Sequence, residues 1–406
     1  MIIHIDGDSF FVSCEVLSRP DLRGKPVITG AERGIASSMN IEAKKIGITR
    51  GMPIFKIKKD FPHVIILPSN FGLYKQYNSR MQQIANRYSD IVEDYSIDEC
   101  FVDVSHIDTW EMQIECARNL KQALKDELGL TFSLGLAPTK VLAKVASKNR
   151  KPDGFTAMRH TDIKDFLVDL PIGDVWGIGK SMSEKFCSVG VTTAIIFIHK
   201  EEEWVKRNFS LPYQTLWHEL RGVSILGVCT EYMAMKSIQS TRTFPRNSCD
   251  REYVFSHLAR NIEISCARLR RMSLYTKKIS IFIKDNELRV YPIDVELRDF
   301  TNFTHEIVSQ ARKYFDSIFV ENKIYKKTGV SCLGLISRKN MTQSLFDNLF
   351  MKNELYSSID EVTNKYGEYA IVLASSMNAV KSYQKKNTKI EKKEKMISVP
   401  YLGEVV

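Results

Sequence analysis

The sequence predicts a mixed α+β protein made of several domains. The chain has 406 residues, which is longer than a single domain usually grows. Residues 1–159 show the order strand, helix, two strands, helix, strand that is typical of a ferredoxin-like unit. Strand and helix patterns alternate again over residues 240–336. Hydrophobic residues make up 44% of the chain and charged residues 26%, so ordinary cores are expected.

The first α+β unit begins with a short apolar run at residues 2–5, which predicts a buried strand that delivers Asp6 at its end. Two more strands are expected within residues 91–104, on either side of a break at 96–99. The other expected elements of this unit are helices at 10–17, 72–89, 111–128 and 138–149 and a strand at 131–136.

Residues 21–70 interrupt this unit, and their glycines and prolines predict a small inserted subdomain of short segments. Residues 160–230 are expected to be mostly helical. Beyond residue 338 we expect one helix near 354–365 and then a flexible or partner-dependent tail, because residues 381–395 hold seven lysines and two glutamates. The second α+β unit is expected to have strands near 279–284, 288–295 and 329–336 and helices near 254–272 and 302–318.

The positive charge of the chain is concentrated in one stretch. The net charge is +10, but residues 1–235 carry 29 basic and 29 acidic residues. Residues 236–340 carry 20 basic against 11 acidic residues, a net +9. Such an excess in one compact unit indicates either a face that binds phosphates or an ordinary lysine-rich surface.

The sequence also indicates a cytoplasmic protein. The eight cysteines show neither C-x-x-C pairs nor zinc spacing with histidine, which is typical of thiols in a reducing compartment. The N-terminus lacks the pattern of a signal peptide, and no apolar run is long enough to span a bilayer, so no membrane partner is expected.

Four acidic residues, Asp6, Asp8, Asp98 and Glu99, are expected near the ends of predicted strands. Carboxylates gathered there would repel one another unless a cation neutralised them. Oxygen ligands suit Mg²⁺, and two such ions can activate a hydroxyl nucleophile and hold a leaving pyrophosphate. The alternative is a set of ordinary acids at strand ends.

Two further patterns indicate phosphate binding. The basic residues Lys144, Lys148, Arg150 and Lys151 could hold a triphosphate, although a solvated helix face is the simpler explanation of this cluster alone. The second pattern is the Gly-x-Gly turn before Lys180, with Gly190 following. It resembles a helix-hairpin-helix, whose backbone N–H groups bind DNA phosphates without reading the base sequence.

Three segments together resemble the catalytic motifs of Y-family DNA polymerases, and the resemblance covers essentially the whole chain. Further segments are similar to the UmuC branch, which supplies the catalytic subunit of bacterial DNA polymerase V. The catalytic segments are Asp6-Gly-Asp-Ser-Phe-Phe-Val-Ser-Cys-Glu15, Tyr95-Ser-Ile-Asp-Glu-Cys-Phe-Val-Asp103, and Ala137-Pro-Thr-Lys-Val-Leu-Ala-Lys144 with Lys151-Pro-Asp-Gly154. The UmuC-like segments are Arg19-Pro-Asp-Leu-Arg-Gly-Lys-Pro26, Asp174-Val-Trp-Gly-Ile-Gly179, Glu219-Leu-Arg-Gly222 and Lys327-Thr-Gly-Val330 leading to Leu345-Phe346.

This resemblance implies a right-hand polymerase with four domains and a C-terminal tail. The ferredoxin-like palm would comprise residues 1–20 and 72–159, with small fingers at 21–71. A helical thumb with the helix-hairpin-helix would occupy residues 160–235. The implied little finger is the basic α+β unit at 236–338, followed by a tail at 339–406 with a possible clamp-binding motif.

The resemblance also implies roles for individual residues. Asp6, Asp98 and Glu99 would be catalytic and would ligate two Mg²⁺ ions, with the Gly7 carbonyl completing one site. Phe11 would be the steric gate that excludes a ribose 2′-hydroxyl. The other implied contacts are Ser38, Lys44 and Lys151 for the nucleotide, Gly177, Gly179 and Lys180 for DNA, and Gln343, Leu345 and Phe346 for the sliding clamp.

Two departures from the family pattern bear on these roles. Many members have Tyr and Arg where this chain has Ile41 and Lys44, so a hydroxyl and a bidentate fork are missing from the expected triphosphate site. The clamp motif of the branch is usually Gln-Leu-x-Leu-Phe, whereas residues 342–346 read Thr-Gln-Ser-Leu-Phe. An ordinary amphipathic turn is the alternative explanation of that segment.

The activity implied is error-prone, template-directed addition of deoxynucleoside monophosphates to a primer 3′-hydroxyl, past damaged bases, in the SOS response. The implied partners are primer–template DNA, a deoxynucleoside triphosphate, a self-cleaved UmuD-like dimer, a recombinase filament and the sliding clamp. Two other classes fit parts of the pattern: a nucleotide cyclase with a similar palm, and a catalytically silent DNA-binding subunit. The helix-hairpin-helix and the basic unit argue against the first, and the intact acids against the second.

Overall fold

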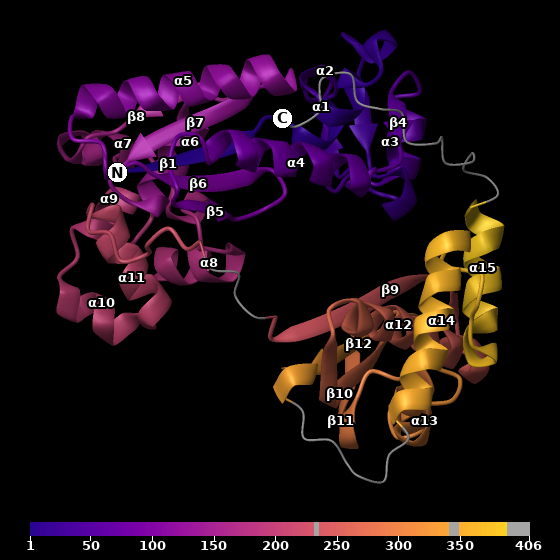
Figure 1. The fold of residues 1–406 in the computed structure, drawn as a ribbon. Coiled ribbons are helices and arrows are strands. Elements are labelled where there is room, and N and C mark those ends of the chain that lie inside the picture. The colour runs from indigo at the N-terminus through magenta and orange to yellow at the C-terminus, as the bar shows by residue number, and fades with distance from the viewer. Residues whose placement is uncertain (231–234, 341–348, 388–406) are drawn as a thin grey trace. The chain divides into compact units, whose positions relative to one another are not determined.

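The computed structural model describes residues 1–230, 235–340 and 349–387 (Figure 1). The described residues divide into two compact units, one within residues 1–232 and one within residues 233–394. Each unit has hydrophobic clusters of its own, built from side chains of that unit alone. The two units are therefore described separately.

A five-stranded sheet forms the centre of the first unit (Figure 1). Its strand order is β5-β6-β1-β7-β8, in which β7 and β8 are parallel and the other neighbours are antiparallel. The pair of strands expected within residues 91–104 is present as β5 and β6. The strands are β1 (Ile2–Gly7), β5 (Val92–Asp94), β6 (Glu99–Asp103), β7 (Phe132–Ala137) and β8 (Phe155–Ala157).

Helices cover both faces of this sheet. Because side chains alternate along a strand, Ile3 and Ile5 of β1 face one side, where they form a core with α4 (Phe71–Ala85) and α5 (Trp110–Leu128). His4 and Asp6 face the other side, where α6 (Lys140–Asn149) packs. Strand β1 thus contributes apolar side chains to one face of the sheet and polar side chains to the other.

The approach of α6 to the sheet depends on one glycine. A Cβ atom added at Gly135 of β7 would lie 2.1 Å from the Ala143 carbonyl oxygen and 2.3 Å from the Ser147 nitrogen. No other residue fits at this position without displacing α6. The side chains of α6 are consequently held against the face of the sheet that carries Asp6.

A second, smaller sheet lies between α1 and α4 in the chain. Its strand order is β3-β2-β4, with β2 and β3 antiparallel and β2 and β4 parallel. Its helices pack a small apolar core against it. The helix before this sheet is α1 (Phe10–Leu17), and the elements of the sheet region are β2 (Val27–Thr29), β3 (Ser38–Met39), α2 (Ile41–Lys45), α3 (Ile54–Asp60) and β4 (Ile65–Leu67).

Short helices make up the rest of the first unit, as the sequence predicts. Aromatic rings form their centre: Phe186 stacks on Phe209 at 4.1 Å and meets the edge of Phe197 at 4.9 Å. The helices are α7 (Ile163–Leu167), α8 (Lys180–Ser188), α9 (Ala194–Ile198), α10 (Glu202–Asn208) and α11 (Leu211–Leu220).

The second unit repeats the α+β arrangement. Its antiparallel sheet has the order β11-β10-β12-β9, with the short β13 beside β10. The sequence did not predict β9. The elements are β9 (Ser237–Ser248), α12 (Arg251–Arg271), β10 (Leu274–Asp285), β11 (Val290–Thr301), α13 (Thr304–Phe315), β12 (Tyr325–Leu333) and β13 (Ile336–Ser337).

The expected tail beyond residue 338 needs a correction. Helix α14 (Leu349–Tyr366) contains the one helix expected there, but α15 (Met377–Asn387) occupies the start of the lysine-rich stretch. Both helices contact α12 (Figure 1): the Arg270 guanidinium donates two hydrogen bonds of 2.7 Å to Asp360, and the Tyr383 hydroxyl lies 3.0 Å from His257 Nδ1. Residues 349–387 thus form an extra helical layer.

The structure confirms the predicted fold class, a mixed α+β protein with a ferredoxin-like first unit and a second α+β unit. Among the described helices, none combines the length and apolar character needed to cross a membrane.

Candidate active site

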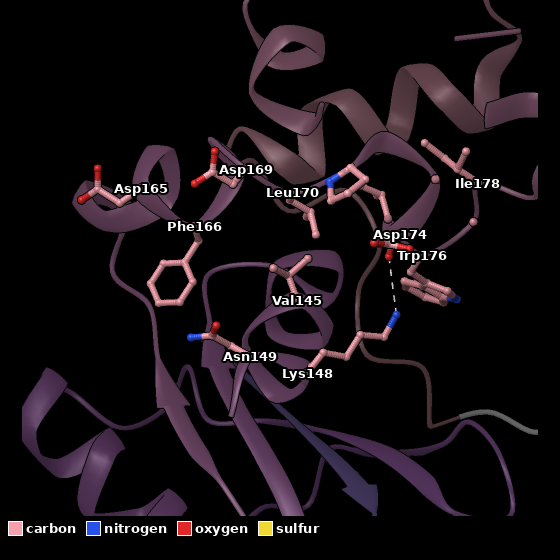
Figure 2. Close-up of a pocket in the computed structure, with 14 residues that line it drawn as sticks. Val145, Lys148, Asn149, Asp165, Phe166, Asp169, Leu170, Asp174, Trp176 and Ile178 are labelled. Atoms are coloured by element: carbon pink, nitrogen blue, oxygen red, sulfur yellow. Dashed lines mark hydrogen bonds between the residues drawn. The ribbon is translucent and has the colours of Figure 1, made fainter. Parts of the chain in front are cut away.

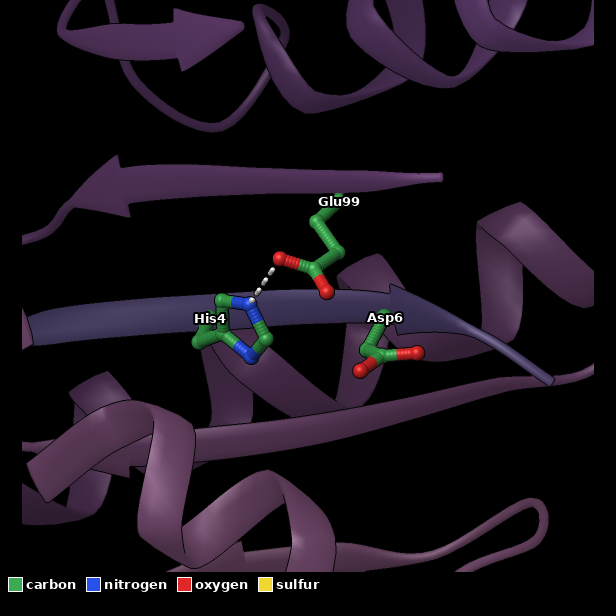
Figure 3. A group of neighbouring side chains, drawn as sticks. All are labelled: His4, Asp6 and Glu99. Carbon is green, nitrogen blue, oxygen red and sulfur yellow. Dashed lines mark ion pairs between the residues drawn. The ribbon is translucent and has the colours of Figure 1, made fainter. Parts of the chain in front are cut away.

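Two predicted acids face each other across neighbouring strands. Asp6 near the end of β1 pairs in register with Glu99 at the start of β6, so both carboxylates project to the face that α6 covers. One ligand atom from each of His4, Asp6 and Glu99 lies within 4.8 Å of the others (Figure 3). The sheet register therefore creates the acidic pair that the sequence motifs predicted.

His4 completes this group, and the sequence analysis missed it. Its ring is fully buried; Nδ1 lies 2.7 Å from the Ser147 hydroxyl of α6, and Nε2 lies 3.6 Å from Glu99 Oε2 (Figure 3). Burial lowers the pKa of the His4 imidazole, so the ring is neutral near pH 7. The available signal was a single polar residue within an otherwise apolar strand.

Two lysines neutralise the acidic pair. Lys144 Nζ lies 2.5 Å from Glu99 Oε2, and Lys151 Nζ lies 2.5 Å from Asp6 Oδ1. Burial by itself would raise the pKa of the Glu99 carboxyl, but His4 and Lys144 outweigh it and lower this pKa to about 2. Burial raises the pKa of the Asp6 carboxyl, which Lys151 offsets only in part. The site therefore favours a cation next to Asp6.

Asp98 lies beside this group, on the turn that enters β6. Its carboxylate accepts a 2.8 Å hydrogen bond from the Ser96 hydroxyl, and its carbonyl oxygen accepts one of 2.9 Å from the Gly7 N–H. Gly7 and Asp98 are thus tied together through the backbone. Asp98 does not belong to the group of described residues whose ligand atoms all lie within 4.8 Å of one another.

Asp8 has a different role from the other acids. Its buried carboxylate accepts hydrogen bonds from the Ser133 hydroxyl at 2.8 Å and from the Asp153 N–H at 2.7 Å. The second contact fixes the turn that carries Lys151. Asp8 consequently positions a lysine of the site while its own oxygens are occupied by protein donors.

Two predicted nucleotide residues of the small sheet, Ser38 and Lys44, converge on Ser9, the N-cap residue of α1. Lys44 Nζ donates a 3.0 Å hydrogen bond to the Ser9 hydroxyl, and the Ser38 hydroxyl donates one of 3.3 Å to the Ser9 carbonyl. Ile41 is 47% exposed beside them. The structure thus brings Ser38 and Lys44 to one place, at Ser9, which follows the strand that carries Asp6.

Phe11 is fixed by other aromatic side chains. Its ring stacks on Tyr74 at 4.5 Å with 7° between the planes, and the edge of Phe71 lies 5.6 Å away. The Tyr74 hydroxyl in turn donates a 2.8 Å hydrogen bond to Glu15. The ring predicted to be the steric gate therefore has a defined orientation.

The Gly-x-Gly turn presents exposed backbone before a helix. Gly177 has φ of +92°, a conformation that favours glycine, and Gly179 is the N-cap of α8. Lys180 begins this helix and is exposed. The N–H groups at the start of α8 can therefore meet a phosphate, as the motif predicts.

Lys148 belongs to a different part of the surface from Lys144 and Lys151. It lines an open pocket of about 950 Å³ between α6 and residues 165–178, where its ammonium lies 3.5 Å from the Asp174 carbonyl oxygen (Figure 2). The lining also includes Asp165, Asp169 and Trp176, and none of the paired acids. The predicted four-residue basic cluster is thus divided.

Family comparisons account for most of the chain. The impB/mucB/samB family matches residues 5–148, the C-terminal domain of that family matches residues 235–345, and the helix-hairpin-helix motif of the IMS family matches residues 160–191. The three matches follow one another along the chain without overlap.

Similar proteins extend this result. DNA polymerase IV of Pasteurella multocida is 33% identical over 278 residues, which cover 66% of this chain and 77% of that protein. The chain belongs to the Y family of DNA polymerases. It is a DNA-directed DNA polymerase of the translesion class. DNA polymerase IV 1 of Bacillus subtilis is 29% identical over 399 residues, or 95% of each chain.

Solved structures show the same fold. A Y-family polymerase chimera of Dbh and Dpo4 superposes with a TM-score of 0.73 at 24% identity, covering 83% of this chain and 99% of that one. A structure described as an insertion ternary complex of Dbh DNA polymerase gives a TM-score of 0.53 over the same shares. The fold of this Y-family polymerase thus includes the palm, the helix-hairpin-helix and the little finger.

Y-family polymerases use divalent metal ions, and the residues of this site fit such an ion. Asp6 and Glu99 offer carboxylate oxygens within 4.8 Å of each other, which is the donor type that hard cations prefer. The ammonium groups of Lys144 and Lys151 show that these two carboxylates already attract positive charge. The predicted clamp residues Gln343, Leu345 and Phe346 lie outside the described residues.

Proposed function

We propose that this polymerase performs error-prone synthesis across damaged template bases by a two-metal mechanism. The observation that carries the proposal is the in-register pair of Asp6 and Glu99, held by the sheet and neutralised by two lysines. The reaction adds a deoxynucleoside monophosphate to the primer 3′-hydroxyl and releases pyrophosphate. A nucleotide cyclase and a silent DNA-binding subunit, both considered from the sequence, do not fit Y-family membership.

The proposed metal ligands are Asp6, Asp98, Glu99 and the Gly7 carbonyl, for two Mg²⁺ ions. Bound metal would lower the pKa of the primer hydroxyl and stabilise the charge of the leaving pyrophosphate. The sheet fixes Asp6 and Glu99 before any ligand arrives, and the Ser96 hydroxyl holds one oxygen of the Asp98 carboxylate. Positioning by the backbone therefore precedes metal binding.

The proposed nucleotide contacts are Ser38, Lys44 and Lys151. Lys44 and Ser38 already meet at Ser9, and Lys151 is one-third exposed on a turn, so it can move from Asp6 to a phosphate. Phe11 would exclude the ribose 2′-hydroxyl, since its ring is held by stacking on Tyr74 and by the edge of Phe71. Because Ile41 has no donor, affinity for the triphosphate would depend on the lysines.

The proposed grip on DNA has two parts. Backbone N–H groups at Gly177 and Gly179, with Lys180, would bind the phosphates of the duplex. The net +9 of residues 236–340 would add attraction that does not depend on base sequence. In the proposed division, residues 1–20 and 72–159 are the palm, 21–71 the fingers, 160–235 the thumb and 236–338 the little finger.

The cellular setting is proposed from the UmuC-like segments. They favour a role in the SOS response, in the cytoplasm, with a cleaved UmuD-like dimer, a recombinase filament and the sliding clamp as partners. The similar proteins described above are named DNA polymerase IV instead. Dependence on a UmuD-like dimer therefore distinguishes the two branches.

Primer extension tests the proposal. The purified chain is given Mg²⁺, four deoxynucleotides and either an intact template or one with an abasic site. We expect extension past the abasic site. Extension on the intact template that stops at the abasic site of the other would refute lesion bypass. Failure on both, with DNA binding intact and with a UmuD-like dimer and an activated recombinase filament added, would refute catalysis by this chain.

A further inference from the structure

Lys144 differs from Lys151 in its freedom to move. The Lys144 side chain is only 9% exposed and projects from the middle of α6, whereas Lys151 is 33% exposed on a turn. Lys151 can leave Asp6 for a phosphate, but α6 is fixed against β7 by the close approach at Gly135. The Lys144 ammonium consequently stays within reach of Glu99.

The Lys144 ammonium makes cation–π contacts with two aromatic rings. It lies 4.6 Å from the centre of the Tyr95 ring and 5.0 Å from that of Trp176. The Trp176 indole donates a 3.1 Å hydrogen bond to the Tyr95 hydroxyl and meets its ring edge-on at 5.3 Å. A cation is attracted to the faces of aromatic rings. The two rings therefore hold the Lys144 ammonium next to Glu99.

Two lysines balance the charges of Asp6 and Glu99 without any bound ion. Asp6 and Glu99 carry two negative charges, and each contacts one lysine at 2.5 Å. If Lys151 leaves for the nucleotide, one resident positive charge remains. That charge weakens the attraction between the acids and an incoming divalent cation, because Coulomb interactions are strong in a poorly hydrated site.

We propose that Lys144 is a resident counter-cation of Glu99, which positions this carboxylate and limits how tightly the site binds a divalent metal ion. This inference rests on the proposed function, since Glu99 is one of the proposed metal ligands. Lys144 would be a positioning residue. Its charge keeps the acids together without metal and prevents the metal from binding too tightly.

The test measures metal binding without catalysis. Full-length protein is titrated with Mn²⁺ alone, and free Mn²⁺ is followed by electron paramagnetic resonance. We expect Lys144→Met to lower the half-saturating Mn²⁺ concentration about threefold or more, since a nearby positive charge is lost. Lys144→Gln should do the same, and Lys144→Arg, which keeps the charge, should stay near the wild-type value.

Lys148→Met is the matched control, because it removes the same charge one turn along α6, where the side chain lies at the pocket instead of the acids. It should leave the Mn²⁺ midpoint unchanged. A midpoint that is unchanged or raised in both Lys144→Met and Lys144→Gln would overturn the proposal, as would an equal fall in Lys148→Met.

Thermal unfolding gives a second measurement. In chelator, Lys144→Met should melt at a lower temperature than wild type. Saturating Mn²⁺ should raise the melting temperature of Lys144→Met by more than it raises that of wild type. A gain that is smaller than or equal to the wild-type gain would overturn the proposal. Mn²⁺ binding that survives in both Asp6→Asn and Asp98→Ala would instead refute the metal assignment of the proposed function. The two failures are therefore distinguishable.

Discussion

Asp98 offers the most direct test at the scale of single residues. Its carboxylate contacts only Ser96 among the described hydrogen bonds, while its backbone holds Gly7. Asp98→Ala therefore removes a proposed metal ligand and keeps the turn. We expect primer extension to fall more than about 100-fold, because even outer-shell metal partners are worth 10- to 100-fold.

The control for this variant is Asp94→Ala, which removes an exposed acid of β5 four residues earlier. It should extend primers as wild type does. DNA affinity, measured by fluorescence anisotropy, should be unchanged in both variants. Extension that persists in Asp98→Ala would show that this residue is not a metal ligand.

Phe11 tests the discrimination between sugars. Removing the ring in Phe11→Ala opens the space above the sugar, and the flanking Tyr74 and Phe71 cannot replace it because each is held by other contacts. We expect the preference for deoxynucleotides over ribonucleotides to fall about 10- to 200-fold, the range for a steric difference in an apolar pocket. Single-nucleotide insertion kinetics measure it.

Phe55→Ala provides the comparison, since this ring of α3 is 77% exposed and touches none of the gate residues described above. Its sugar preference should match that of wild type. If Phe11→Ala keeps full discrimination, another side chain excludes the 2′-hydroxyl.

At the scale of elements, the sequence predicted the helices and strands that are determined by a local pattern of apolar and polar residues. The strands that carry Asp6 and Glu99 were predicted because an apolar run precedes Asp6 and another follows Glu99. Strand β9 was missed because Ile238 and Phe244 are its only large buried apolar residues and Pro245 lies within it, which an edge strand tolerates.

The C-terminal helices were only partly predicted for a related reason. Helix α15 is rich in lysine and polar residues, and its buried side chains are known only once α12 is in place against them. Likewise, the role of His4 depends on Ser147 from a helix more than 100 residues away. Tertiary contacts of this kind leave no periodic signal in the sequence.

The ion pair of Asp360 with Arg270 tests the extra helical layer. Arg270 is 12% exposed and also lies 4.5 Å from the Tyr356 ring, so Asp360→Ala leaves a largely buried charge without its carboxylate partner. We expect the second unit to lose about 2 kcal/mol of stability, less than for a fully buried pair because Asp360 is 30% exposed.

Hydrogen exchange in α12 and α14 measures this loss, with Glu361→Ala as the exposed neighbouring control, expected within about 0.5 kcal/mol of wild type. Tryptophan fluorescence would not report it, because all four tryptophans lie in the first unit. Equal exchange in both variants would mean that the ion pair does not hold α14.

At the scale of the whole molecule, the acids of the candidate active site and the excess positive charge lie in different units. The first unit carries the acids and has no net charge over residues 1–235, whereas residues 236–340 carry +9. In a chain with this division, the excess positive charge that attracts the DNA backbone belongs to one unit and the acidic pair to the other. The salt dependence of DNA binding should therefore belong mainly to the second unit.

Truncation after residue 230 tests that separation. The hydrophobic clusters of the first unit use only residues up to 228, so this fragment keeps its cores, which circular dichroism can verify. The slope of log affinity against log salt is about 0.9 per phosphate neutralised on duplex DNA. We expect the fragment to lose more than half of the full-length slope while keeping the contacts at Gly177 and Gly179. A slope equal to that of the full chain would assign the grip to the thumb and leave the +9 of the second unit without a role in binding DNA.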